Sequence, residues 1–233
     1  MLRRLPLGSP RGPRPPLATR SAVTAVPLAH AEVGVRGTRP PLVLLHGIFG
    51  NHGNFHTVAK ALVRRVGGQV LTVDARNHGS SPHSPLMTYE AMSLDVQHLL
   101  TQLGIHKCIL VGHSMGGKTA MVLALQRDPQ LRQFLLTNLV EVEGRYIWRV
   151  NLDAISHHFA DIMSFPVFHK PYPGPALFLG GSKSPYISSK DYPEIQRLFP
   201  KADVQFIEGA GHIVHQDKFE EFIAAVLSFL PSP

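Results

Sequence analysis

The chain has 233 residues, of which 44% are hydrophobic, and a formal net charge of +7 at pH 7. This length suits one globular domain, and the apolar content is enough for a sizeable core, which argues against a disordered or fibrous protein. The single cysteine, Cys108, cannot form an internal disulfide, so a reducing compartment is the natural setting.

The positive charge is concentrated at the N-terminus. Residues 1–31 contain no Asp or Glu but five arginines, namely Arg3, Arg4, Arg11, Arg14 and Arg20. Such a stretch, with Ser, Thr and Ala between the arginines, is typical of a transit peptide, so we expect mitochondrial targeting to the matrix. The alternative is a plain basic tail, because several prolines weaken any amphipathic helix there. We expect neither a transmembrane segment nor nucleic-acid binding, since no long apolar stretch and no recognition motif is seen.

From residue 41 onward, short apolar runs alternate with segments of helical period, a pattern typical of parallel strands joined by crossover helices. The expected strands are 41–45, 69–73, 107–111, 175–179 and 202–207, and their continuous apolar character indicates burial on both faces. Amphipathic helices are expected over 89–103, with Gly104 ending the first, and over 219–230. Residues 32–233 are therefore predicted to form one α/β domain, with a mostly parallel sheet and helices on both faces.

The most specific motif is Gly112-His113-Ser114-Met115-Gly116, a G-x-S-x-G between the expected strand 107–111 and a helical segment, 117–126. A strand that reverses sharply into a helix holds the central residue in a strained conformation at the tip of the turn. The helix N-terminus also favours the negative charge that develops during attack. The motif predicts Ser114 as a nucleophile; an incidental serine in a Gly-rich turn is the alternative.

A serine nucleophile needs a base. Folds that hold the serine on a strand-turn-helix place this base in a loop after the last strand. His212 ends the run Gly209-Ala210-Gly211-His212, between the expected strand 202–207 and the C-terminal helix. His215 is its rival, but the position directly after the glycines favours His212.

Acyl transfer also needs two backbone N–H groups that point at one oxygen. The run His46-Gly47-Ile48-Phe49-Gly50 follows the first strong strand, and we assign the amides of Ile48 and Met115 as the donors. His46 is expected to bond this loop rather than act as a second base. In the turn 74–79, Arg76 is expected to donate to buried carbonyls and to form an ion pair, and so to hold the turn in place.

The strings HGIFG, VDARNHG, GHSMGG and GAGH, in this order, resemble the α/β-hydrolase superfamily. DARNHG followed by SPHS, and GHSMGGKTAM, are similar to a branch of small esterases that contains bacterial YbfF-type esterases and the mitochondrial abhydrolase domain-containing protein 11. This resemblance covers roughly residues 41–230. It implies a serine hydrolase that cleaves acyl or lipid esters through an acyl-enzyme, with diacylglycerol-type lipids as candidate substrates. No cofactor or metal is expected, since H-E-x-x-H and cysteine pairs are missing from the sequence.

The chain departs from this family after the nucleophile helix. There the family has a further strand ending in an Asp, followed by a helical lid, whereas here residues 126–131 pass almost directly into 134–140. We therefore expect one strand and much of the lid to be absent, with 132–170 as a remnant of the lid region. The sheet should contain a gap, or two strands that are normally separated should pair.

The acid of the triad is affected by the same departure. The usual position, after the strand 175–179, reads Gly-Ser-Lys-Ser and contains no carboxylate, and Asp191 suits a helix N-cap better. The resemblance assigns Asp153 as the acid that orients His212; a solvated carboxylate on a lid helix is the alternative. If the missing strand supplied the acid, the chain is instead a catalytically impaired binding or interaction protein. Thioesterase or peptidase activity also fits a triad of this kind.

Overall fold

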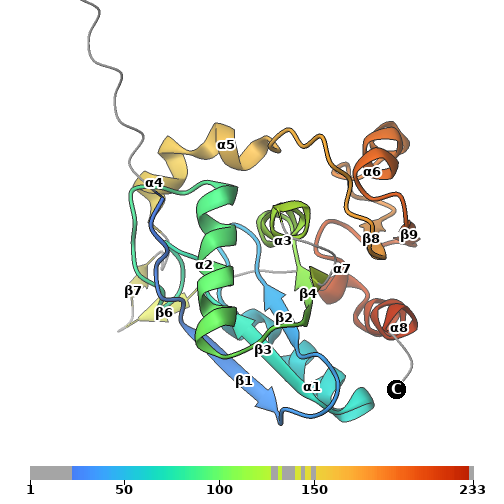
Figure 1. The fold of residues 1–233 in the computed structure, drawn as a ribbon, viewed down its shortest axis with the longest axis horizontal. Coiled ribbons are helices and arrows are strands. Elements are labelled where there is room, and N and C mark those ends of the chain that lie inside the picture. Colours follow the sequence, from blue (N-terminus) through green and yellow to red (C-terminus); the bar gives the residue numbers. More distant parts are fainter. Residues whose placement is uncertain (1–22, 127–130, 133–139, 143–144, 148–150, 231–233) are drawn as a thin grey trace, which may run out of the picture.

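The computed structural model describes residues 23–126, 131–132, 140–142, 145–147 and 151–230 (Figure 1). Its centre is a five-stranded sheet with the order β1-β3-β2-β4-β5. Only β1 runs antiparallel to its neighbour, so the predicted α/β class with a mostly parallel sheet is confirmed. The strands are β1 (His30–Gly34), β2 (Leu42–Leu45), β3 (Gln69–Val73), β4 (Cys108–Gly112) and β5 (Leu131–Arg132).

Helices cover both faces of this sheet. Successive side chains of a strand point to opposite faces, so neighbouring residues of β2 pack against different helices. Leu44 of β2 belongs to the apolar cluster that includes α1 (His56–Val66) and α8 (Phe219–Phe229). Val43 belongs to the cluster formed with α2 (Tyr89–Gln102) and α3 (Met115–Gln126). The central strands β2, β3 and β4 are therefore buried on both faces, as their continuous apolar runs predict. The predicted strand 202–207 is only partly buried, and its Phe206 is exposed.

The C-terminal strands form a separate sheet. β8 (Ala176–Gly181) and β9 (Ala202–Ile207) pair in parallel with one another, and in the described residues neither is hydrogen-bonded to the five-stranded sheet. Leu177 and Leu179 nevertheless belong to the same apolar cluster as α1 and α8. The two sheets are thus joined by side-chain packing, and within the described residues the sheet has the gap that was one of the two predicted outcomes.

The remaining elements are short. They are η1 (His52–Phe55), β6 (Val140–Val142), β7 (Arg145–Ile147), α4 (Leu152–His157), α5 (Phe159–Met163), η2 (Ser189–Asp191), α6 (Tyr192–Leu198) and α7 (Val214–Asp217). The predicted lid remnant, 132–170, contains the β6–β7 hairpin, α4 and α5, although part of it lies outside the described residues. Among the helices that can be described, none has the length and apolar character needed to cross a membrane.

The N-terminal strand was not expected from the sequence. β1 begins at His30, so it spans the boundary between residues 31 and 32 at which the domain was predicted to start. The chain before it is also packed, since Leu28 is buried and the Val26 N–H donates to Asp95 Oδ1 at 2.7 Å. The transit peptide remains a prediction, and residues 1–22 of it lie outside the described residues.

Candidate active site

Ser114 lies where β4 turns into α3, with a backbone φ of 49°. This left-handed conformation is strained for a non-glycine residue. A Cβ on Gly112 would lie 2.4 Å from the Gly116 carbonyl oxygen, and one on Gly116 would lie 2.2 Å from the carbonyl oxygen of Leu45. The two glycines of the motif therefore allow the backbones to approach closely, as the sequence predicts.

The loop after β2 packs directly against this turn. A Cβ on Gly47 would lie 3.3 Å from the Ser114 Cβ. His46 holds the loop, because its Nδ1 donates to the Gly47 carbonyl at 2.7 Å while its Nε2 accepts from the Ala75 N–H at 2.9 Å. Burial is the main cause that lowers the pKa of His46 to about 4. The ring is therefore neutral and structural, as expected.

The two predicted oxyanion donors lie on either side of the turn. Ile48 follows Gly47 in the loop, and Met115 is the first residue of α3; their side chains pack in one apolar cluster. In the described residues, neither backbone N–H donates to another protein group. Both amides are thus free to bind an oxygen, and the N-terminus of α3 favours negative charge there.

The turn after β3 is locked by buried polar contacts. Arg76 forms a bidentate ion pair with Asp95 of α2, with Nε to Oδ2 at 2.6 Å and Nη2 to Oδ1 at 2.7 Å. Arg76 also donates to the carbonyls of Leu86 and Thr24, both at 3.0 Å. The predicted role of Arg76, to satisfy buried carbonyls and an ion pair, is confirmed.

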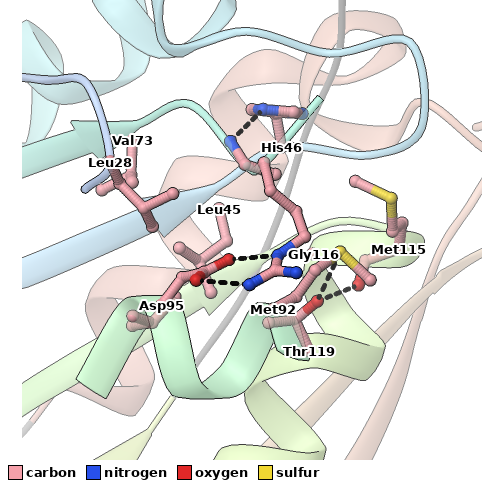
Figure 2. A pocket seen from close by; sticks show the side chains of 12 residues that line it. Leu28, Leu45, His46, Val73, Met92, Asp95, Met115, Gly116 and Thr119 are labelled. Carbon is pink, nitrogen blue, oxygen red and sulfur yellow. Dashed lines mark hydrogen bonds and ion pairs between the residues drawn. The ribbon is translucent and has the colours of Figure 1, made fainter. Parts of the chain in front are cut away.

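A small cavity lies behind the turn, between Asp95 and the nucleophile helix (Figure 2). Its volume is about 20 Å³, room for about one water molecule, whereas ligand pockets usually exceed about 300 Å³. Met115, Gly116 and Thr119 form its α3 side, and Thr119 Oγ1 donates to the Met115 carbonyl at 2.9 Å. This cavity is therefore too small to hold an acyl ester.

His212 lies in the loop between β9 and α7, next to the turn. Its half-buried ring lies against His113, with ring centroids 4.3 Å apart, and against Tyr186, at 4.2 Å. His113 Nε2 donates to the His212 carbonyl at 3.1 Å. Burial lowers the pKa of His212. The structure therefore places the His212 ring against His113, the residue that precedes Ser114, and no hydrogen bond joins the Ser114 hydroxyl to the His212 ring in the described residues.

The rival histidine occupies a different environment. His215, in α7, is 2% exposed and packs between the rings of Phe55 and Phe222. Neither of its ring nitrogens has a hydrogen-bond partner in the described part of the chain, and burial lowers its pKa to about 3. An enclosed apolar site leaves no path for a substrate proton, so the geometry favours His212 over His215 as the base.

The structure does not bring Asp153 to His212. Asp153 is an exposed residue of α4 and lines an open hollow of about 450 Å³ together with His83 and His157. Figure 1 shows α4 beside the end of α2, whereas α7 lies on the far side of α3. Within the described residues, no hydrogen bond or ion pair connects the Asp153 carboxylate to His212.

Asp191 lies at the expected N-cap position of α6, and its carboxylate serves the short helix before it. It occupies the N-cap position of α6 without a side-chain bond to that helix. Its carboxylate instead accepts from the Ser188 N–H at 2.8 Å and closes a capping box on η2. The expected N-cap position at α6 is thus confirmed, although the carboxylate bonds to the preceding short helix and not to α6.

Sequence reasoning missed Tyr186 and the contact of His113 with the base. Tyr186 lies in the loop that follows β8, the loop in which the sequence offers no acid. Loops after the carboxyl ends of parallel strands meet at one edge of a sheet, and this placement is the signal that points to Tyr186. The described residues contain no cluster of His, Cys, Asp or Glu that could hold a metal ion.

Comparisons with known proteins agree with this geometry. A family model described as the alpha/beta hydrolase fold matches residues 40–150. The chain is 48% identical over 250 residues to the sn-1-specific diacylglycerol lipase ABHD11 of Xenopus laevis, covering 83% of this chain and 80% of that protein. It is also 30% identical over 242 residues to esterase YbfF of Escherichia coli strain K12, covering 82% and 92%.

Among solved structures, a marine microorganism esterase superimposes with a TM-score of 0.80 at 28% identity, covering 88% of this chain and 100% of that one. The alignment to the Xenopus laevis lipase is longer than the 233 residues of this chain, so the relative has residues without a counterpart here. This agrees with the predicted missing segment. The chain belongs to the α/β-hydrolase fold family, in the branch that contains the ABHD11 lipases and esterase YbfF.

Proposed function

We propose that the protein hydrolyses carboxylic esters of acyl or lipid type through an acyl-enzyme on Ser114. The observation that carries this proposal is the positive φ of Ser114 at the junction of β4 and α3, inside a G-x-S-x-G sequence. Ser114 lies at the tip of this turn, next to the loop at Gly47, and the neighbouring His113 contacts the base loop at His212.

The chemistry follows from these positions. Ser114 Oγ attacks the ester carbonyl carbon while His212 accepts its proton. The N–H groups of Ile48 and Met115 bind the oxygen of the tetrahedral intermediate, which carries the negative charge. His212 then donates the proton to the departing alcohol, and a water molecule, deprotonated by the same ring, releases the acid and restores the serine.

Lipid substrates are proposed from the relatives' names, which describe diacylglycerol lipases and esterases. A direct test compares hydrolysis of short p-nitrophenyl esters and of diacylglycerol by the wild type, Ser114→Ala and His212→Gln. We expect turnover by the wild type only. Undiminished turnover by Ser114→Ala contradicts the assignment of the nucleophile.

A second function, binding without catalysis, is favoured by one observation. In the described residues His212 has no carboxylate partner, and a triad normally uses one to hold the tautomer and stabilise the imidazolium. This candidate predicts a folded, monodisperse wild type that binds acyl esters without cleaving them. Turnover that depends on Ser114 rejects it.

We also propose that residues 1–31 direct the protein to the mitochondrial matrix, on the basis of their arginine content. Fusion of these residues to a fluorescent reporter should give mitochondrial import. The same fusion with the five arginines replaced by Gln should remain outside, and equal import of both reporters contradicts the proposal.

A further inference from the structure

His212 lies between two aromatic rings from distant parts of the chain. His113 comes from the nucleophile turn and Tyr186 from the loop after β8, and their centroids lie 4.3 Å and 4.2 Å from that of His212. The interplanar angles are 45° and 39°, so both rings are tilted against the imidazole. These contacts restrict how the imidazole can rotate about its side-chain torsions, because a large rotation would collide with one ring or the other.

The loop that carries His212 is held as well. The His113 Nε2–H donates to the His212 carbonyl at 3.1 Å, and the Gly211 N–H donates to Asp217 Oδ2 at 2.7 Å. His113 is buried, and burial is the largest cause that lowers its pKa to about 2, so the ring is a neutral donor. One side chain therefore fixes both the backbone and the ring of the base.

We infer that His113 and Tyr186 are positioning residues that orient His212 in this chain, in the place where a triad would use a carboxylate. This inference rests on the proposed function. Two observations support it: the loop after β8 presents Tyr186 to the base, and Asp153 lies on α4, away from α7 (Figure 1).

Two substitutions of Tyr186 distinguish the effect of its ring from the effect of its hydroxyl. Tyr186→Ala removes the ring, whereas Tyr186→Phe keeps it. We expect Tyr186→Ala to lower kcat for a p-nitrophenyl ester by about 10- to 100-fold with little change in KM, because misplaced catalytic groups cost rates of this order. Tyr186→Phe should recover most of the rate. Tyr192→Ala, at another exposed tyrosine, is the matched control and should match the wild type.

A second readout does not depend on catalysis. An aromatic ring 4.2 Å away shifts the NMR signals of the His212 ring protons, which can be assigned by their loss in His212→Gln. Tyr186→Ala should move these signals and Tyr186→Phe should leave them close to the wild-type positions. The full-length chain is used throughout.

The pH dependence of kcat/KM adds a test that a purely structural role would not pass. Tyr186→Ala exposes one face of the His212 ring to water and so relieves part of the burial that lowers the His212 pKa. The acidic limb of the kcat/KM profile should therefore move to higher pH. The groups that face His212 in the folded chain are His113 from the turn, Tyr186 from the β8 loop and His215 from α7. Of these, only Tyr186 is changed, so the shift reports on its ring.

Each result decides a different point. If the His212 signals do not move in Tyr186→Ala, the ring contact is wrong. If the signals move but the rate equals that of Tyr192→Ala, the contact exists and the positioning role is wrong. If the wild type has no esterase activity, the proposed function fails, and the NMR comparison still decides whether Tyr186 holds the ring.

His113 is tested through its hydrogen bond. His113→Leu removes the donor, whereas the side-chain amide of His113→Gln can still donate to the His212 carbonyl. We expect a kcat lower by about 10-fold or more in the Leu variant and a partial recovery in the Gln variant. Urea unfolding of both variants separates an effect on the site from an effect on the fold. Equal rates in two variants that are as stable as each other contradict the role of His113.

Discussion

Arg76 and Asp95 form an ion pair whose side chains are 1% and 0% exposed, and both residues also bind the backbone that precedes β1. The guanidinium donates to the Thr24 carbonyl, and the Val26 N–H donates to the Asp95 carboxylate. The pair thus joins three segments: the turn after β3, helix α2 and the chain before β1.

Removal of one partner should strongly destabilise the protein. Asp95→Asn leaves the buried guanidinium without a counter-charge, and we expect a loss of about 3–5 kcal/mol in the free energy of unfolding, measured with urea. Glu220→Gln is the matched control. It breaks the exposed pair of Arg65 and Glu220, whose loss should cost at most about 1 kcal/mol. Equal effects of the two variants would contradict the structural role of the buried pair.

The same contacts predict where the N-terminus can be shortened. A chain that starts at residue 30 lacks Leu28 and both backbone contacts of Arg76 and Asp95, whereas a chain that starts at residue 23 keeps them. We expect the shorter chain to unfold at a lower urea concentration than the longer one. Coincident unfolding curves would show that residues 23–29 contribute nothing to stability.

The glycine after the nucleophile should not tolerate a side chain. A Cβ on Gly116 would overlap backbone carbonyl oxygens of β2 and the following loop, so Gly116→Ala must distort the turn or unfold the protein. We expect a loss of about 1–3 kcal/mol and of most esterase activity. Gly37→Ala is the control, since a Cβ there meets nothing within 4 Å. Wild-type activity in Gly116→Ala would contradict the close approach of the strands.

The buried histidine of α7 predicts acid sensitivity. The folded-state pKa of His215, about 3, lies below its ordinary value of 6.5, so the unfolded chain binds a proton more readily. The contribution of His215 to stability is complete above pH 6.5 and falls by about 1.4 kcal/mol per pH unit as the pH decreases from 6.5 toward 3.

His215→Leu removes this titration and keeps an apolar side chain between Phe55 and Phe222. The plot of unfolding free energy against pH should become less steep between pH 6.5 and 4, while buried His46, His78 and His113 retain part of the slope. An unchanged slope in His215→Leu would mean that His215 is not buried as described.

The gap between the sheets predicts two levels of local stability. Among the residues that the structure describes, β8 and β9 form backbone hydrogen bonds in a ladder only with each other, whereas β2 is hydrogen-bonded on both sides, by β3 and β4. Hydrogen exchange measured by mass spectrometry should be faster in 176–181 and 202–207 than in 42–45. Equal protection of these segments would indicate a continuous sheet.

Much of the fold could be predicted because its signals are local. The runs 69–73 and 202–207 coincide with β3 and β9, and the predicted helix 219–230 differs from α8 by one residue at its end. β1 was missed because the sequence His30–Gly34 includes a polar Glu32 and lies beside an arginine-rich leader. β1 is formed by pairing with β3, a long-range contact that local periodicity cannot predict.

The candidate active site also has parts that local motifs predict and parts that depend on long-range contacts. The turn at Ser114, the loop at His46 and the position of His212 follow from short motifs that each adjoin one strand. The surroundings of His212 depend instead on how two loops meet at the edge of a divided sheet. Tyr186 was missed because its place in the loop after β8 indicates only which edge of the sheet it occupies, and Asp153 was carried over by resemblance.

The most direct test of the central claim is covalent labelling of the full-length chain by a fluorophosphonate probe, which reacts with an activated serine. The wild type should be labelled in a single position, with Ser114 modified in the mass spectrum, and Ser114→Ala should not be labelled at all. Labelling of Ser114→Ala equal to that of the wild type, or an unlabelled wild type that is folded, would contradict the assignment of Ser114 as an activated nucleophile.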